Sequence, residues 1–306
     1  MKVIIAGGSG FLGSALTRAL VARRHDVVII SRHSAPASAG VRYVKWRPDT
    51  TNALGPPGQE WTRELDGADA VVNLAGAGIA DTRWSAARKA ELRESRVGST
   101  RALVAAVRAT SRRPSVFIQG SAMGYYGTAA ADVIFDESSR AGSDFLGRLC
   151  VEWEAEARPV EQLGCRLAYL RSGIVLGHGG ALAKMRRPFL FFVGGAIAPG
   201  HQYFSWIHVE DWIALVLWLL DTPGLSGTFN GTAPNPVTNT ELSRALGRAL
   251  HRPSWLPVPG FALRILFGEL ADAGFINGQR VVPKRALEMG FKFKYAAIDD
   301  AMAAAV

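Results

Sequence analysis

The feature that most constrains the fold is a glycine-rich turn near the N-terminus. The run from Lys2 to Ala6 (KVIIA) is short, apolar and β-branched, which is typical of a buried strand. It ends at Gly7, where the sequence GGSGFLG begins, and apolar residues then continue at helical spacing. A strand, a GxxGxxG turn and a helix in this order predict a site for a dinucleotide.

Each glycine of the turn has a different task. Gly7 permits a tight turn, Gly10 lets the backbone approach a pyrophosphate, and Gly13 lets the helix pack closely on the strand. The unpaired amides at the start of the helix then form an anion site. The candidate cofactor-binding residues of this turn are Gly7, Ser9, Gly10, Phe11, Leu12 and Gly13.

The next strand indicates which dinucleotide is bound. Asp26 to His33 is predicted to be a second parallel strand, and Ser31 and Arg32 lie at its carboxyl end with no acidic residue nearby. An NAD site usually has Asp or Glu at this place to hold the ribose hydroxyls. A guanidinium instead binds a 2′-phosphate, so Ser31 and Arg32 predict NADP(H). The alternative is that Arg32 is simply solvated at a strand end.

Further strands and helices alternate along the chain. A long helix is expected from Trp84 to Arg112, and a surface loop from Arg47 to Gln59. The other predicted strands are Val41 to Trp46, Ala70 to Leu74, Val116 to Gln119 and Arg166 to Leu170. This alternation predicts an α/β fold, a Rossmann doubly wound parallel sheet, with a smaller C-terminal subdomain on the substrate side.

Ligands of open α/β sheets bind at the carboxyl ends of the strands. Small residues at those ends allow a ribose or an adenine to lie against the backbone, and Arg171 could meet an anionic group of the substrate. The candidate cofactor-binding residues at these ends are Leu74, Ala75, Gly76, Gly120, Arg171, Gly173 and Ile174.

The motifs GGSGFLG, NLAG, GSAMGYYG and RSGIVLG resemble those of the short-chain dehydrogenase/reductase superfamily, in its extended or atypical branch. More narrowly, FSWIHVED, NGTAPNPVTN and the closing GQRVVPKRALEMGFKFKY resemble the nucleoside-diphosphate-sugar epimerase-like family, some of whose members are described as cell-division inhibitors. The resemblance implies an NADP-binding domain over residues 1–230, with a substrate-side insertion at about 177–205. A small C-terminal subdomain, residues 231–306, would pack over the cleft.

The resemblance fails at the usual acid–base pair. The superfamily places Tyr-x-x-x-Lys on a helix, where the lysine lowers the pKa of the tyrosine. Here Phe145 and Leu149 occupy those two positions, and neither transfers a proton. Candidate replacement acids are Tyr125, Tyr126 and Ser121, with one of the two tyrosine rings expected in the core.

Two expectations concern residues near these candidates. His208 is a further candidate acid, and capping of the helix that follows it is the alternative. The segment after Phe145 is expected to present a solvated helix face, formed by Glu152, Trp153, Glu154 and Glu156.

The sequence therefore favours a cytoplasmic NADP(H)-dependent oxidoreductase or epimerase-like enzyme with a small-molecule substrate, a small carbonyl or hydroxyl compound or a nucleotide sugar. The alternative is a dinucleotide-sensing regulatory protein, connected with cell division, that has lost the acid–base pair. A homodimer is an expectation from the superfamily.

Other classes are disfavoured. The net charge of +9 is not gathered in a dense basic block, so no nucleic-acid partner is expected. No secretory signal and no apolar run of spanning length is found, so no membrane association is expected. Cys150 and Cys165 lack metal-ligand spacing, and no metal site is predicted.

Overall fold

A seven-stranded parallel sheet forms the centre of the molecule. The structure, a computed structural model, describes residues 1–32, 40–46, 59–129 and 132–306. The strand order is β11-β7-β5-β4-β1-β2-β3, so the chain builds outward from β1 in both directions. This confirms the predicted doubly wound fold. The strands are β1 (Lys2–Ala6), β2 (Asp26–Ser31), β3 (Val41–Lys45), β4 (Ala70–Asn73), β5 (Val116–Ala122), β7 (Arg166–Ser172) and β11 (Gly227–Gly231).

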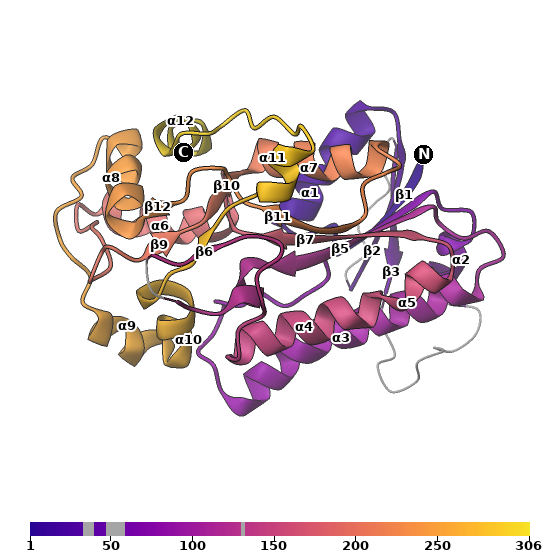
Figure 1. Ribbon diagram of the computed structural model, residues 1–306, viewed down its shortest axis with the longest axis horizontal. Helices are drawn as coiled ribbons and strands as arrows, with labels where there is room; N and C mark the ends of the chain where they lie inside the picture. The colour runs from indigo at the N-terminus through magenta and orange to yellow at the C-terminus, as the bar shows by residue number, and fades with distance from the viewer. Residues whose placement is uncertain (33–39, 47–58, 130–131) are drawn as a thin grey trace.

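Helices cover both faces of the sheet. Helices α3 and α4 lie side by side along one face, and α1 and α7 pack together on the other (Figure 1). The helices of these two layers are α1 (Phe11–Ala22), α2 (Glu60–Leu65), α3 (Ala86–Ala109), α4 (Phe145–Ala157), α5 (Pro159–Gln162) and α7 (Val209–Asp221).

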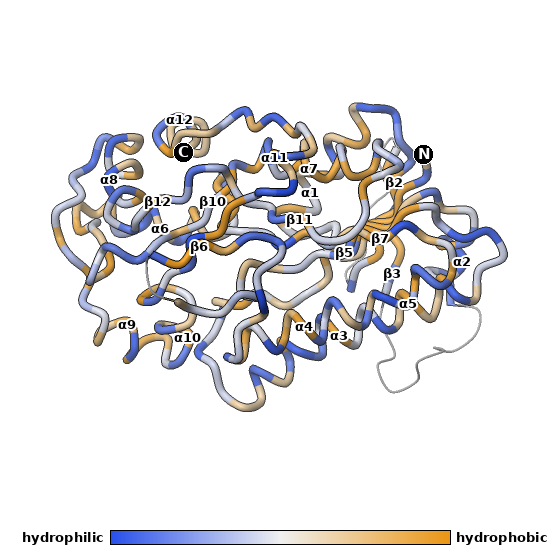
Figure 2. Tube along the Cα trace, viewed as in Figure 1, coloured by the Kyte–Doolittle hydropathy of each residue, from blue (hydrophilic) through white to orange (hydrophobic). Residues whose placement is uncertain are grey.

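The alternation of side chains along β1 divides the core into two layers. Val3 and Ile5 are fully buried with Leu16 and Leu20 of α1, whereas Ile4 packs in the layer of α2, α3 and α5. Successive residues of a strand point to opposite faces, so an apolar run such as KVIIA fits a sheet that is buried on both sides. Figure 2 shows the resulting band of hydrophobic residues through the central strands.

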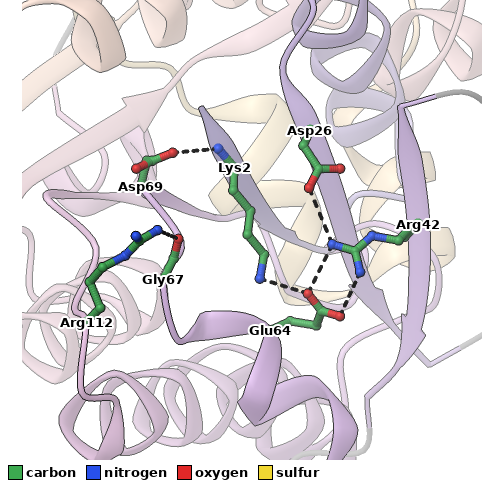
Figure 3. A network of polar contacts seen from close by, with 7 residues as sticks. All are labelled: Lys2, Asp26, Arg42, Glu64, Gly67, Asp69 and Arg112. Carbon is green, nitrogen blue, oxygen red and sulfur yellow. Dashed lines mark hydrogen bonds and ion pairs between the residues drawn. The ribbon is translucent and has the colours of Figure 1, made fainter.

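A polar network ties the amino ends of the strands together, at the edge opposite the candidate site. Glu64 of α2 pairs with Lys2 of β1 at 2.9 Å and with Arg42 of β3 at 3.1 Å (Figure 3). Arg42 also reaches Asp26 of β2 at 3.4 Å, and the Lys2 amide donates to Asp69 at 2.7 Å. These ion pairs and hydrogen bonds connect three strands of the sheet to one another and to α2.

Most of the remaining elements gather at the end of the molecule away from the N-terminus, whereas α11 (Lys284–Glu288) lies near α7 (Figure 1). Several of them share a third apolar cluster, in which Leu182, Leu246 and Met302 are buried. These elements are β6 (Ile134–Phe135), β8 (Ile174–Leu176), α6 (Gly180–Leu190), β9 (Tyr203–Phe204), β10 (Trp206–His208), β12 (Val237–Thr238), α8 (Asn239–Leu250), α9 (Gly260–Phe267), α10 (Glu269–Ala271), β13 (Arg280–Val281), α11 (Lys284–Glu288) and α12 (Ile298–Ala305), with one 3₁₀ turn, η1 (Met123–Tyr126), and one π turn, η2 (Asp272–Ile276).

The predicted elements differ from the observed ones mainly at their ends. Strand β2 stops at Ser31, and His33 lies outside the described residues, as does most of the expected loop from Arg47 to Gln59. Strand β5 continues three residues past Gln119, to Ala122. In the part of the chain that the structure describes, no helix is long and apolar enough to cross a membrane.

Candidate active site

The candidate residues lie at one edge of the sheet, at the carboxyl ends of five strands. Strands β2, β1, β4, β5 and β7 are neighbours and all run parallel, so their carboxyl ends meet there. The glycine turn follows β1, Arg32 follows β2, Leu74 follows β4, and Ser121 and Arg171 lie near the ends of β5 and β7. This is the edge at which doubly wound folds bind their ligands.

The glycine turn has the geometry that its sequence predicts. Gly7 adopts φ +77°, which residues with a side chain rarely take. A Cβ at Gly13 would lie 2.5 Å from the Cα of Gly8, so helix α1 could not pack against the turn with any larger residue. Gly10 differs, because a Cβ there would meet only the Gly7 carbonyl oxygen, at 3.5 Å. The Gly10 backbone is therefore open to a ligand.

The first turn of α1 is suited to a negatively charged group. Gly10 is its N-cap and supplies no side-chain hydrogen bond, and the first turn holds no acidic residue. The amides of Phe11, Leu12 and Gly13 have no partner within the helix because they belong to its first turn. Ser9 and Gly10 are exposed beside them. The donor set fits a dinucleotide diphosphate.

The end of β2 lies next to this turn. The Gly7 amide donates to the Ile30 carbonyl oxygen at 3.3 Å, which brings Ser31 and Arg32 beside the turn. Ser31 is buried, whereas Arg32 is exposed and has no ion pair with any described residue. The Arg32 guanidinium is therefore available to an anionic ligand.

The ends of β4 and β5 approach each other closely. The Ala75 amide donates to Oδ1 of Asn73 at 3.2 Å, and a Cβ at Gly120 would lie 2.7 Å from the Asn73 carbonyl oxygen. Gly76 is exposed and Leu74 is partly buried. Only small residues fit at Gly120, and the backbone after Leu74 faces the ligand edge as expected.

Arg171 forms a buried ion pair instead of facing solvent. Its Nε and Nη2 donate to Glu154 at 2.8 Å each, and its Nη1 donates to the Tyr126 hydroxyl at 3.1 Å. Ser121 Oγ donates to the same carboxylate at 2.7 Å. Burial alone would lower the pKa of Arg171, but the hydrogen bonds and charge of Glu154 raise it overall. Glu154 already neutralises this guanidinium, so an anionic substrate group would have to displace that carboxylate.

The two tyrosines occupy different surroundings. Tyr126 is 3% exposed, donates to Asn230 Oδ1 at 2.7 Å and stacks on Phe135. Burial raises the pKa of Tyr126 to about 12, against the opposing charge of Arg171. The Tyr125 ring lies over the Arg171 guanidinium, 3.2 Å from ring centre to Cζ, and its hydroxyl has no partner among the described residues. Tyr126 is thus the core ring, and Tyr125 holds the available hydroxyl.

The loop between β7 and β8 is held by backbone pairing. The Gly173 amide donates to the Gly231 carbonyl oxygen and the Ile174 amide to that of Ser205, each at 2.9 Å. A Cβ at Gly173 would lie 2.7 Å from the Ser205 carbonyl oxygen. Neither of these two amides is free to bind a cofactor, although both residues are partly exposed.

His208 caps a helix. Its Nδ1 accepts from the Glu210 amide at 3.3 Å at the start of α7, and its ring packs on Tyr295 with 4.0 Å between centres. The side chain is buried and Nε2 has no partner among the described residues. The capping role expected as the alternative is therefore the one observed.

The positions of the missing acid–base pair are apolar. Phe145 packs edge-on against Trp84, with 5.1 Å between ring centres. Leu149 is 3% exposed and lies in a cluster with Val97 and Trp153. Phe145 and Leu149 make apolar contacts at both positions. No described side chain therefore replaces the tyrosine or the lysine of the acid–base pair at these two places.

The expectation of a solvated face on α4 was wrong for two residues. Trp153 and Glu154 are buried, because they lie one turn after Leu149 and Cys150 on the side of α4 that meets α3 and the sheet. Glu152 is exposed as expected, and Glu156 pairs with Arg101 at the surface of α3. Two residues at this edge were not predicted from the sequence. Glu154 holds both Ser121 and Arg171, and the guanidinium of Arg96, from α3, lies against Gly76.

The fold and the glycine turn place the chain among the dinucleotide-binding Rossmann proteins. A profile of the NAD dependent epimerase/dehydratase family matches residues 3–230, and one of a domain of unknown function, DUF1731, matches residues 258–305. The chain belongs to the NAD dependent epimerase/dehydratase family, which confirms the resemblance seen in its motifs.

Relatives match the chain along nearly its whole length. It is 42% identical to the chloroplastic epimerase family protein SDR39U1 homolog of Arabidopsis thaliana, over 99% of this chain and 86% of that protein. It is also 42% identical to the epimerase family protein Mb2239 of Mycobacterium bovis, over 98% and 96%. The crystal structure of human epimerase family protein SDR39U1 (isoform 2) with NADPH has a TM-score of 0.88 and 33% identity, and the match covers 100% of this chain and 99% of that one.

Proposed function

We propose that the protein is an NADP(H)-dependent oxidoreductase or epimerase-like enzyme that acts on a small carbonyl or hydroxyl compound or a nucleotide sugar. The observation that carries the proposal is the open glycine turn beside Arg32, which forms no ion pair with any described residue. The amides of Phe11 and Leu12 would hold the diphosphate, and Arg32 the 2′-phosphate. The human relative crystallised with NADPH supports the same choice of dinucleotide.

The nicotinamide would give or take a hydride at the substrate carbon. When hydride is given to a carbonyl carbon, Tyr125 would supply the proton to the oxygen, and when hydride is taken from a carbinol carbon, ionised Tyr125 would accept the proton of the hydroxyl. Tyr125 is chosen because its hydroxyl is the one that has no partner among the described candidates. Arg171, held in place by its ion pair with Glu154, would position the Tyr125 ring by packing against its face. Ser121 would act beside it, with its proton directed to Glu154 and its oxygen left to accept.

Titration of the purified protein with NADPH and NADH, followed by fluorescence, tests the cofactor. We expect tighter binding of NADPH, and Arg32→Asp should abolish that preference because a carboxylate repels a phosphate. Preference for NADH in the unaltered protein would refute the assignment of Arg32. NADPH oxidation across a panel of carbonyl compounds and nucleotide sugars then tests the enzymatic proposal.

The second candidate is a dinucleotide-sensing regulatory protein. The apolar packing of Phe145 and Leu149 favours it, because the positions of the usual acid–base pair have become part of the core. NADPH binding without turnover on the whole panel would support this candidate. We further expect a cytoplasmic homodimer that binds neither nucleic acid nor membranes, which size-exclusion chromatography and cell fractionation would check.

A further inference from the structure

Arg96 of helix α3 lies against the backbone at the carboxyl end of β4. A Cβ at Gly76 would lie 3.1 Å from its Cζ, so the guanidinium lies against Gly76, in the loop that follows β4. Arg96 also lies over the Trp153 ring, with 5.2 Å from Cζ to the ring centre. The arginine is partly buried between α4 and the loop that follows β4.

The charge of Arg96 is not neutralised by any described residue. Its hydrogen bond is from Nη1 to the Leu92 carbonyl oxygen of its own helix, at 3.2 Å. Three other arginines of α3 each pair with a glutamate: Arg88 with Glu91, Arg93 with Glu152 and Arg101 with Glu156. Burial lowers the pKa of Arg96, which agrees with a guanidinium held partly out of water without a counter-ion. An arrangement of this kind costs free energy in the free protein.

Gly76 is exposed, and its strand lies next to β1, which carries the glycine turn. Val97, which follows Arg96, packs with Leu149, at the position where the resemblance leads us to expect a lysine. A positive charge is therefore present in this part of the site, but it comes from α3 instead of α4. Arg171, which also lies at this edge, already has a carboxylate.

We propose that Arg96 binds a phosphate oxygen of a ligand at the carboxyl end of β4. The inference rests on the proposed function, since it needs a phosphate-bearing ligand at this edge. Nε and Nη2 make no hydrogen bond to any described residue, and together they offer the forked pair of donors that phosphate oxygens accept. The phosphate belongs either to the dinucleotide or to a nucleoside-diphosphate substrate.

The test compares Arg96→Met and Arg96→Lys with Arg93→Met, a control on the same helix whose arginine is exposed and paired with Glu152. NADPH binding is titrated by fluorescence, and UDP is then titrated calorimetrically into the NADPH-saturated protein. We expect Arg96→Met to lower the affinity for one of the two ligands by at least about tenfold, because hydrogen bonds to a charged group are lost. Arg96→Lys should lose less of that affinity, because it keeps the positive charge. Arg93→Met should bind both ligands as tightly as the unaltered protein does.

The affected ligand identifies the source of the phosphate. Weaker NADPH binding assigns Arg96 to the dinucleotide, and weaker UDP binding at unchanged NADPH affinity assigns it to the substrate. Equal affinities for both ligands in Arg96→Met and the unaltered protein overturn the proposal. Failure of the unaltered protein to bind NADPH would instead refute the proposed function. The melting temperature of ligand-free Arg96→Met should be unchanged or higher, whereas a purely structural arginine would lower it when removed.

Discussion

The carboxylate of Glu154 and the guanidinium of Arg171 form two parallel hydrogen bonds, each 2.8 Å long, beneath the Tyr125 ring. The two side chains are 11% and 5% exposed. They join helix α4 to strand β7 at the ligand edge, and Ser121 of β5 donates to the same carboxylate. The position of both Tyr125 and Ser121 therefore depends on one buried ion pair.

Replacing Glu154 with Gln should destabilise the protein strongly. Removing one partner leaves the Arg171 charge buried without a counter-ion, which costs about 3–5 kcal/mol in the free energy of unfolding. Urea unfolding followed by circular dichroism measures the loss. Glu152→Gln is the matched control, because Glu152 pairs with Arg93 at the surface of the same helix and should cost at most about 1 kcal/mol. Similar losses in the two variants would contradict the assigned role of Glu154.

The two adjacent tyrosines should respond in opposite ways to loss of the hydroxyl. Tyr126→Phe removes a donor to Asn230 and an acceptor for Arg171, both buried, so it should lower the free energy of unfolding by about 1–3 kcal/mol. Tyr125→Phe removes a hydroxyl without a described partner and should leave stability nearly unchanged. On any substrate the panel identifies, however, it should reduce turnover roughly 100-fold or more. Full turnover in Tyr125→Phe would exclude Tyr125 as the acid.

Restoring the lysine of the superfamily should fail. Leu149 is buried with Val97 and Trp153, and the Arg96 guanidinium already lies over the Trp153 ring, with 5.2 Å from Cζ to the ring centre. Leu149→Lys would therefore bury an ammonium group in an apolar cluster near another cation, and we expect a loss of several kcal/mol and no gain in turnover. Val151→Lys is the control, since Val151 is 42% exposed on the same helix and should change stability by less than about 0.5 kcal/mol. A stable, more active Leu149→Lys would show that the cluster can open to admit a lysine.

The parts of this site that the sequence predicts are those set by local chemistry. Gly7 and Gly13 have conformational or contact requirements that only glycine meets, so their spacing alone indicates the turn. The capping box of Thr238 and Glu241 at the start of helix α8 is likewise local. In each case the residues that determine the structure lie within a few positions of one another.

The roles of Glu154 and Arg96 depend on which face each helix turns to its neighbours. Glu154 lies four residues after buried Cys150, and Arg96 lies four after buried Leu92, so helical spacing alone puts both on apolar faces. The helical spacing of both residues is visible in the sequence, but a charged residue on a helix is normally expected to face solvent. Only the packing of α3 against α4 and of α4 against the sheet shows that the charge of Glu154 is paired, whereas that of Arg96 has no counter-ion in the described part of the chain.

Protonation of His208 should make stability fall in mildly acidic solution. Burial lowers the pKa of His208 below its ordinary value of 6.5, while Glu210 and Asp211 oppose the shift and Lys294 and His178 add to it. Below about pH 6.5 His208 therefore binds a proton in the unfolded chain but stays neutral in the folded protein. The free energy of unfolding decreases as pH falls for this reason. Above that pH both states are neutral at this residue and the contribution is constant.

His208→Asn isolates this effect. Asn is a good N-cap and can accept from the Glu210 amide as His208 does, but it does not titrate. Loss of the ring contact with Tyr295 should lower stability by the same amount at every pH. The measurement is thus the slope of unfolding free energy against pH between about 7.5 and 5, which should be shallower in His208→Asn. His25, whose pKa is also lowered, contributes equally to both proteins. Identical slopes would mean that His208 accepts its proton in the folded state as readily as in the unfolded chain.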